Sequence, residues 1–350
     1  MKIALVTGSC GLVGSESSIF FSKKGFKILG IDNNARKFFF GKDGDISWVK
    51  KNLQKNIKNY NHFNIDIINY SSLKKIFQKY NKKIKVIIHA AAQPSHDWAK
   101  DKPFIDFEIN AKGTLNLLEL TKSYCPKAPF IFMSTNKVYG DNPNFLPILE
   151  KKTRWEIKKN HRFKNGIDET MSVDNCTHSF FGASKTYADL IVQEYGKNTG
   201  LKTACFRAGC ITGPKHSGAK LHGFLSYLVK ISIKKNQYTL IGYKGKQVRD
   251  NIHSHDLVSC FWEFFKNPSK GEVYNTGGGR YSNCSVIEAL NLVEKIAGIK
   301  IKRKILRQNR VGDHIWYVTN MKKFKKHYPN WKQKFSTYKI IEELVKEHSK

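Results

Sequence analysis

Three glycines at intervals of three residues stand near the start of the chain, in the run Thr7-Gly-Ser-Cys-Gly-Leu-Val-Gly14. The apolar run 2–6 before them predicts a buried strand, and the residues after Gly14 predict a helix. Such a turn lets the backbone approach a pyrophosphate, which the N–H groups and the positive dipole at the helix start can bind. Asp32 ends the next predicted strand, 26–32, where a carboxylate can bind the adenosine ribose hydroxyls and favours NAD over NADP. These residues predict an NAD-binding βαβ unit.

Strands and helices alternate through the rest of the first 210 or so residues. Apolar runs predict further strands at 63–67, 85–89, 130–133 and 202–207. Helical spacing of apolar residues covers 109–123, and we expect further helices at 46–57 and 184–197. This alternation predicts an α/β fold built on a Rossmann-type doubly wound parallel sheet.

The pattern changes after about residue 140, where a polar loop begins. We expect residues 1–212 to form the NAD-binding domain, with a substrate loop at 141–170. Beyond residue 213 the segments shorten and mix. We expect 213–350 to form mainly a smaller C-terminal substrate-binding lobe, with some of its segments returning to the sheet.

The composition of the 350-residue chain excludes several classes of protein. Its formal net charge is +33, from 61 Lys and Arg against 28 Asp and Glu, but the lysines are spread along the chain, so surface composition is favoured over nucleic-acid binding. No apolar run approaches the ~18 residues of a membrane helix. Seven scattered cysteines without a CxxC pair indicate reduced thiols in a cytoplasmic protein, and with no HExxH motif we expect no metal.

Further motifs, in order, resemble those of the extended short-chain dehydrogenase/reductase family, the NAD-dependent nucleotide-sugar epimerases and dehydratases. They include the Asp66-Ile67 pair, the run His89-Ala-Ala-Ala-Gln93, the helix segment around Asn110, and Ser134-Thr-Asn-Lys-Val-Tyr-Gly-Asp141. The resemblance implies cofactor contacts from Gly8, Gly11, Leu12, Val13, Gly14, Asp32, Asn33, Asp66, Ile67, Ala90, Ala91, Ala92, Asn110 and Lys185. It implies contacts to a nucleotide-diphosphate sugar from Gln93, Asn136, Glu169, His222, Phe224, Arg249 and Arg310.

Within this family the resemblance is greatest to the branch that epimerises C2 of CDP-linked sugars. The segments Ser134–Asp141, Thr153-Arg-Trp155, Gly166–Thr170 and Gly245–Asp250 look like those of that branch. The branch oxidises a ring hydroxyl with bound NAD and then reduces the ketone from the opposite face. The family also implies a homodimer built on the helices 109–123 and 184–197.

One family residue is missing. The general base of the family is the tyrosine of a Tyr-x-x-x-Lys pair, whose spacing places both side chains on one helix face. Here Lys185 is present, but the residue four positions before it is Phe181, which keeps the ring and lacks the hydroxyl. The resemblance implies that Thr135 hydrogen-bonds the reacting sugar oxygen.

Three interpretations of Phe181 remain open. Lys137, two residues after Thr135, could act as the base if burial near Lys185 lowers its pKa. Tyr139 or Tyr187 could substitute for the missing hydroxyl. Alternatively, the chain could be an inactive NAD-binding module that binds RNA or a protein. Asn136 and Lys137 stand where the related dehydratases carry an Asp-Glu pair, which favours epimerisation or simple redox chemistry over dehydration.

Overall fold

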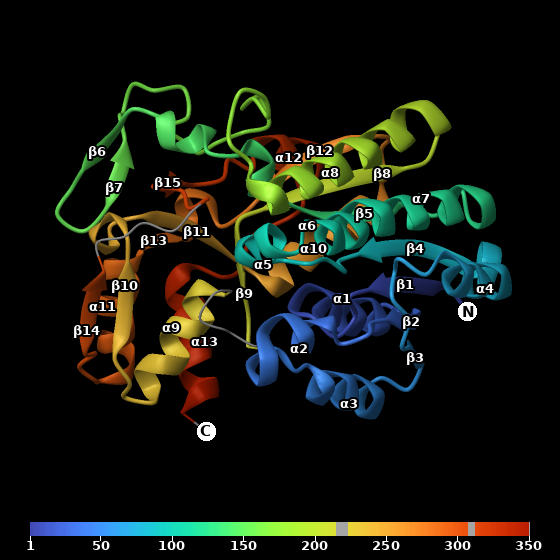
Figure 1. The fold of residues 1–350 in the computed structure, drawn as a ribbon, viewed down its shortest axis with the longest axis horizontal. Coiled ribbons are helices and arrows are strands. Elements are labelled where there is room, and N and C mark those ends of the chain that lie inside the picture. Colours follow the sequence, from blue (N-terminus) through green and yellow to red (C-terminus); the bar gives the residue numbers. More distant parts are fainter. Residues whose placement is uncertain (215–222, 307–311, 350) are drawn as a thin grey trace. The chain divides into compact units, whose positions relative to one another are not determined.

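The computed structural model describes residues 1–214, 223–306 and 312–349 (Figure 1). Seven strands form one sheet, in which the pairings of β1, β2, β3, β4 and β5 are parallel. The predicted parallel α/β fold is therefore confirmed. The strands run in the order β12 (Glu272–Thr276), β8 (Thr203–Ala208), β5 (Phe130–Thr135), β4 (Ile84–His89), β1 (Ile3–Thr7), β2 (Lys27–Ile31) and β3 (Tyr60–Phe63).

The predicted strand at 63–67 is displaced in the structure. Strand β3 ends at Phe63, because residues 60–63 pair with β2 in the register that joins Ile28 to Tyr60 and Ile31 to Phe63. The helices that accompany the sheet are α1 (Leu12–Lys23), α2 (Ala35–Phe40), α3 (Ser47–Asn56), α4 (Tyr70–Tyr80), α5 (His96–Asp101), α6 (Pro103–Phe107), α7 (Gly113–Tyr124), α8 (Ser179–Thr199) and α10 (Ser254–Lys266).

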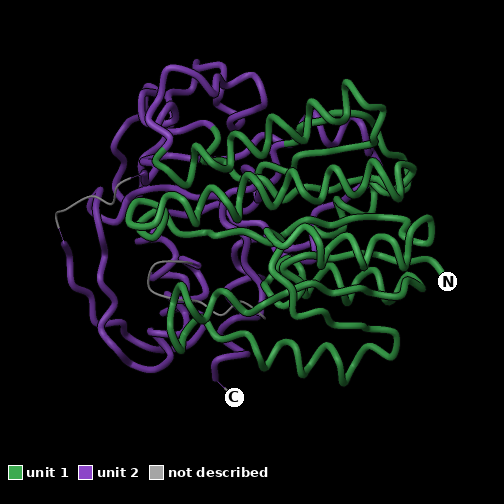
Figure 2. The backbone as a smooth tube through the Cα atoms, turned by 45° about the vertical axis from the view of Figure 1, so that its right-hand side comes forward, with its two compact units in different colours: residues 1–138, 179–207, 258–274 green, residues 139–178, 208–257, 275–350 purple. Residues whose placement is uncertain are grey.

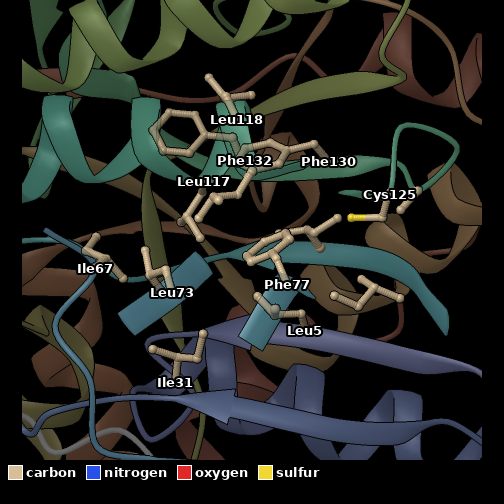
Figure 3. Packing of buried hydrophobic residues seen from close by; sticks show 14 of the residues in the cluster. Leu5, Ile31, Ile67, Leu73, Phe77, Leu117, Leu118, Cys125, Phe130 and Phe132 are labelled. Atoms are coloured by element: carbon tan, nitrogen blue, oxygen red, sulfur yellow. The ribbon is translucent and has the colours of Figure 1, made fainter. Parts of the chain in front are cut away.

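Helices pack on the sheet through continuous apolar surfaces. Strand β1 is buried along its whole length, as expected for a parallel strand covered on both faces. Its Leu5 joins a cluster that includes Phe132 of β5, Phe77 of α4 and Leu117 of α7 (Figure 3). In a separate aromatic group, α1 and α10 meet, where the rings of Phe21 and Trp262 lie 5.6 Å apart. This packing holds the carboxyl ends of β1, β4 and β5 and the segments that follow them.

The chain divides into two compact units that are interleaved in sequence (Figure 2). Unit 1 contains residues 1–138, 179–207 and 258–274, and unit 2 contains 139–178, 208–257 and 275–350. The sequence analysis placed one boundary at 212/213 and expected some later segments to return to the sheet. Contacts place 139–178 in unit 2 and 258–274 in unit 1. A single boundary could not describe this, because packing groups segments that are distant along the chain.

Unit 2 has its own sheets and its own apolar core. Leu228, Leu290 and Ile341 belong to this core, each from a different helix. Its helices are α9 (Phe224–Ile233), α11 (Val286–Ala297), α12 (Lys322–His327) and α13 (Thr337–His348). One of its sheets is built on β11 (Val248–His253), which pairs with β9 (Cys210–Thr212), β13 (Asn283–Ser285) and β15 (Trp316–Tyr317). In a second sheet β10 (Tyr238–Ile241) pairs with β14 (Arg303–Leu306). In a third, β6 (Ile148–Glu150) pairs with β7 (Trp155–Ile157).

Membrane-spanning helices and metal-binding clusters are both absent from the described ranges. No helix there is long and apolar enough to cross a membrane. Nor do three or more His, Cys, Asp or Glu side chains in those ranges gather in a way that could hold a metal ion.

Candidate active site

The glycine turn joins β1 to α1 and is too crowded for side chains. Gly8 has φ 64°, and its carbonyl accepts a hydrogen bond from the Gly11 N–H at 3.0 Å. A Cβ at Gly14 would lie 2.0 Å from the Gly8 oxygen, and a Cβ at Gly8 would lie 2.7 Å from the Ala91 nitrogen. No side chain caps the start of α1, so the first-turn N–H groups of Leu12 and Val13 face the turn. This cradle fits the pyrophosphate of a dinucleotide.

Asp32 lies directly after β2, beside this turn. Its Oδ2 accepts the Cys10 N–H at 2.9 Å and its Oδ1 accepts the Asn34 N–H at 2.8 Å. Burial raises the pKa of the Asp32 carboxyl, and the two N–H donors oppose the rise. The carboxylate is thus fixed at the edge of the turn, in the position that the sequence analysis assigned to the ribose hydroxyls.

Asp66 and Asn33 are joined in the structure. Asn33 Nδ2 donates to Asp66 Oδ2 at 2.9 Å, and Asp66 Oδ1 accepts the Ile68 N–H at 3.0 Å. The neighbouring Ile67 is buried, and a Cβ at Gly113 would come within 2.6 Å of its Cδ1. The structure therefore brings two of the predicted cofactor residues, Asn33 and Asp66, into one hydrogen-bonded pair, and places Ile67 in the core beneath α7.

Two residues predicted to contact ligands, Gln93 and Asn110, lie in a buried hydrogen-bond network. Gln93 Nε2 donates to Asp106 Oδ1 at 2.7 Å and to the Ser95 carbonyl at 2.9 Å, while its Oε1 accepts the Ser95 N–H at 2.5 Å. Asn110 Oδ1 accepts the Gln93 N–H at 3.0 Å, and its Nδ2 donates to the Gln93 carbonyl, to Asp106 and to Ser184. These amides have almost no exposed surface, and their hydrogen bonds fix the segment after β4. Ala90, Ala91 and Ala92 line the start of that segment.

Lys185 and Phe181 lie one turn apart on α8, and the Lys185 side chain reaches the end of β5. Both are buried, with 3% and 7% of their surface exposed. Lys185 Nζ donates to the Met133 carbonyl at 2.9 Å and lies 4.1 Å from the centroid of the Phe132 ring. Burial lowers the pKa of Lys185 to about 8, against the opposing charges of Asp189 and Asp106. The lysine is therefore a desolvated cation next to the end of β5.

The predicted residues after β5 form a short 3-10 helix, Asn136–Tyr139. Thr135 is half-buried, and its Oγ1 accepts the Lys137 N–H at 3.2 Å. Asn136 is buried. The two tyrosines proposed as substitutes have other contacts: the Tyr139 hydroxyl donates to Asn275 Oδ1 at 2.8 Å, and the Tyr187 ring lies 6.1 Å from that of Phe107.

An ion pair buried under α8 fixes this helix to the sheet. Arg207 of β8 donates to Asp189 of α8 through Nη2 at 2.6 Å and Nε at 3.1 Å. Ser134 Oγ of β5 donates to the same carboxylate at 2.5 Å. Because Asp189 is one turn after Lys185, the ion pair holds the lysine against the end of β5.

The sequence analysis missed one functional candidate in unit 1. His96 begins α5, and its Nδ1 lies 2.8 Å from Ser179 Oγ. Its ring also meets the Phe181 ring at 4.8 Å between centroids, at an interplanar angle of 64°. The sequence did contain a signal for His96, since it stands three residues beyond Gln93 in the segment after β4. Open parallel sheets bind their ligands at the carboxyl ends of the strands, where this segment begins.

The predicted substrate residues of unit 2 are partly paired. Arg249 of β11 donates to Asp313 Oδ1 at 2.6 Å and to the Val248 carbonyl at 2.8 Å. Glu169 Oε1 accepts the Asn275 N–H at 2.6 Å, and burial raises the pKa of this carboxyl. Phe224 is the first residue of α9. His222 and Arg310 lie outside the described residues.

Comparison with known proteins gives concordant matches. Residues 4–277 match the NAD dependent epimerase/dehydratase family. A CDP-paratose 2-epimerase from Salmonella typhi is 32% identical over 329 residues, covering 92% of each chain. A UDP-glucuronate 4-epimerase from Thermodesulfobacterium geofontis is 27% identical over 348 residues, covering 99% of this chain and 94% of that protein. The structure of a UDP-glucose 4-epimerase from Thermus thermophilus in complex with NAD aligns with a TM-score of 0.78 at 23% identity, covering 99% of each chain, and so shares the fold.

Proposed function

The chain belongs to the NAD dependent epimerase/dehydratase family and is an NAD-dependent enzyme of that kind, and from that premise we propose that it is a nucleotide-sugar epimerase working through a transient keto-sugar. A CDP-linked sugar epimerised at C2 is the proposed substrate. The observation that carries this proposal is the 32% identity to a CDP-paratose 2-epimerase over 92% of both chains. A nucleotide-sugar dehydratase or oxidoreductase with Lys137 as base is the second candidate, favoured by the place of Lys137 two residues after Thr135, in the 3-10 helix that follows β5.

The residues of unit 1 fit the cofactor and the redox chemistry. NAD, when bound, supplies the acceptor and donor for the hydrogen of the sugar carbon. The glycine turn would hold its pyrophosphate, and Asp32 would hold its adenosine ribose. Lys185 would bind the nicotinamide ribose and stabilise negative charge on the sugar oxygen, and Thr135 would hydrogen-bond that oxygen.

The nucleotide diphosphate would be held in unit 2. Arg249 presents a planar guanidinium that can bind two phosphate oxygens at once. Its partner Asp313 orients the guanidinium through the 2.6 Å contact. We propose Arg249 as the diphosphate ligand, with Glu169 and Phe224 on the sugar and base.

The proposal is tested by incubating the protein with NAD and CDP-, UDP-, GDP- and dTDP-linked hexoses in deuterium oxide, with proton NMR of the products. We expect a CDP-sugar to give its epimer without deuterium at the inverted carbon, because the same hydrogen leaves and returns. A stable keto-deoxy product containing solvent deuterium would instead indicate the dehydratase. No change in any of the sugars would contradict both candidates.

We also propose that the enzyme is a homodimer. An apolar face on α6 and α8 exposes 86% of Phe104, 53% of Phe107 and 46% of Leu190. An exposed aromatic group of this kind is typical of protein interfaces. Light scattering should give the dimer mass for the wild type and the monomer mass for a Phe107→Glu/Leu190→Glu variant, while a control Trp48→Glu on the exposed side of α3 stays dimeric. A wild-type monomer at micromolar concentration would contradict the proposal.

A further inference from the structure

We propose that the imidazole of His96 performs the proton transfer for which Phe181 lacks a hydroxyl. This inference rests on the proposed function and names a catalytic residue for it. Its basis is the direct contact between His96 and Phe181, at the helix position where the family carries its general base.

The position of Phe181 determines where a proton acceptor is needed. Phe181 and Lys185 are four residues apart on α8 and share one helix face. The ammonium of Lys185 lies 2.9 Å from the Met133 carbonyl, so this face looks onto the end of β5, next to Thr135. A base for the sugar hydroxyl must therefore lie beside the Phe181 ring, and His96 has its ring 4.8 Å from it.

Ser179 gives the imidazole a defined orientation. Its Oγ lies 2.8 Å from His96 Nδ1 and also accepts the Gly182 N–H at 3.3 Å. In the tautomer whose Nδ1–H donates to Ser179 Oγ, the lone pair of the ring is on Nε2, as a base requires. Ser179 adopts φ 63°, which is uncommon for a residue other than glycine, and such outliers concentrate at functional sites.

A buried hydrogen-bond network fixes the backbone that carries His96. Gln93 bonds to both the N–H and the carbonyl of Ser95, the residue directly before His96. Asp106 and Asn110 hold Gln93 in turn, and Asn110 also donates to Ser184, next to Lys185. One network thus links the His96 segment to the Lys185 segment of α8. This gives the two buried amides, which the sequence analysis assigned to ligands, a positioning role.

The proton and electron count of the step balances. In the oxidation, the O–H bond of the sugar hydroxyl breaks and an N–H bond forms at His96 Nε2. The carbinol carbon is oxidised to a ketone, and its C–H electron pair reduces the NAD that the family uses. In the return step the ketone regains that hydrogen on its opposite face, and Nε2 returns the proton to the oxygen.

The test compares the wild type with H96N, H96N/F181Y and the control H327N, which changes an exposed histidine at the end of α12. We expect H96N to lower the turnover of the CDP-sugar by about 10²- to 10⁴-fold, the usual contribution of a general base. Affinities for NAD and CDP-glucose, measured by calorimetry, should stay within about threefold, a range of less than 1 kcal/mol. The turnover of H96N/F181Y should be at least tenfold higher than that of H96N, because the double variant places a phenol one helical turn from Lys185.

A second readout does not depend on turnover. Diethyl pyrocarbonate should modify His96 in the wild-type protein, and NAD with CDP-glucose should slow that modification, as followed by peptide mass spectrometry. Undiminished turnover in H96N, or modification of His96 at the same rate with and without both ligands, would overturn the role of His96 and leave the epimerase proposal standing. Absence of turnover in the wild type with every sugar would overturn the epimerase proposal, and the role of His96 with it.

Discussion

Lys185→Met is expected to lower the turnover of the nucleotide sugar by about 10²- to 10⁴-fold. Lys185 is the member of the family's Tyr-x-x-x-Lys pair that this chain keeps, and the substitution removes its positive charge. The buried ammonium lies 2.9 Å from the Met133 carbonyl, at the end of the strand that leads to Thr135. Methionine keeps the length and the apolar stem of the side chain. Rates from single-turnover reduction of NAD should fall with the steady-state rate. Turnover within threefold of the wild type would contradict the role of Lys185.

The same variant has an expected effect on stability that depends on pH. Burial lowers the pKa of Lys185 to about 8 in the folded protein, below the ~10.5 of an unfolded lysine. Between these values the unfolded chain binds more protons, so stability from this group rises with pH. Below pH 8 the buried ammonium costs up to about 3 kcal/mol, and this cost disappears above about pH 10.5.

Denaturant unfolding at pH 7 and pH 10 measures this cost. The stability of Lys185→Met relative to the wild type should be greatest at pH 7 and should fall by a few kcal/mol toward pH 10. Lys112→Met, at an exposed site, serves as the control and should show no such change. A difference that is independent of pH would contradict the lowered pKa.

Arg207→Met is expected to reduce the free energy of unfolding by about 3–5 kcal/mol, because it leaves the Asp189 carboxylate buried without its cation. Arg207 and Asp189 expose 7% and 0% of their side chains, and their closest atoms are 2.6 Å apart. Ser134 and Gln193 also donate to the carboxylate, at 2.5 Å and 2.8 Å, and cannot neutralise its charge.

Denaturant unfolding at pH 7 checks this value against an exposed pair. Lys112 and Glu108 lie 3.3 Å apart on the surface, one helical turn apart, and Lys112→Met should cost no more than about 0.5 kcal/mol. Equal losses in the two variants would contradict the assignment of Arg207 as a buried anchor of α8. Because that anchor positions Lys185, Arg207→Met should also lower turnover in the fraction that remains folded.

The sequence located most elements of unit 1, because their signals are local. The strand predicted at 85–89 is β4, Ile84–His89, and the helix predicted at 46–57 is α3, Ser47–Asn56. The strand predicted at 63–67 was wrong by several residues, because the pairing register with β2 ends β3 at Phe63. The helix predicted at 109–123 begins as a π-helix, Glu108–Lys112, before α7. The sequence did not predict the buried network that joins Gln93 and Asn110, because a side chain's burial depends on packing.

The sequence by itself determined the glycine turn, Asp32 and the Phe181–Lys185 pair, because each of these is specified by residues within one βαβ unit or one helical turn. Only the tertiary structure decided what surrounds Phe181. His96 and Ser179 are 83 positions apart, and they meet because α5 and α8 pack together at the carboxyl edge of the sheet. The chain division is also a tertiary property, since unit 2 takes residues 139–178 from the middle of unit 1. Local residue types specify local geometry, whereas packing decides which distant side chains share a site.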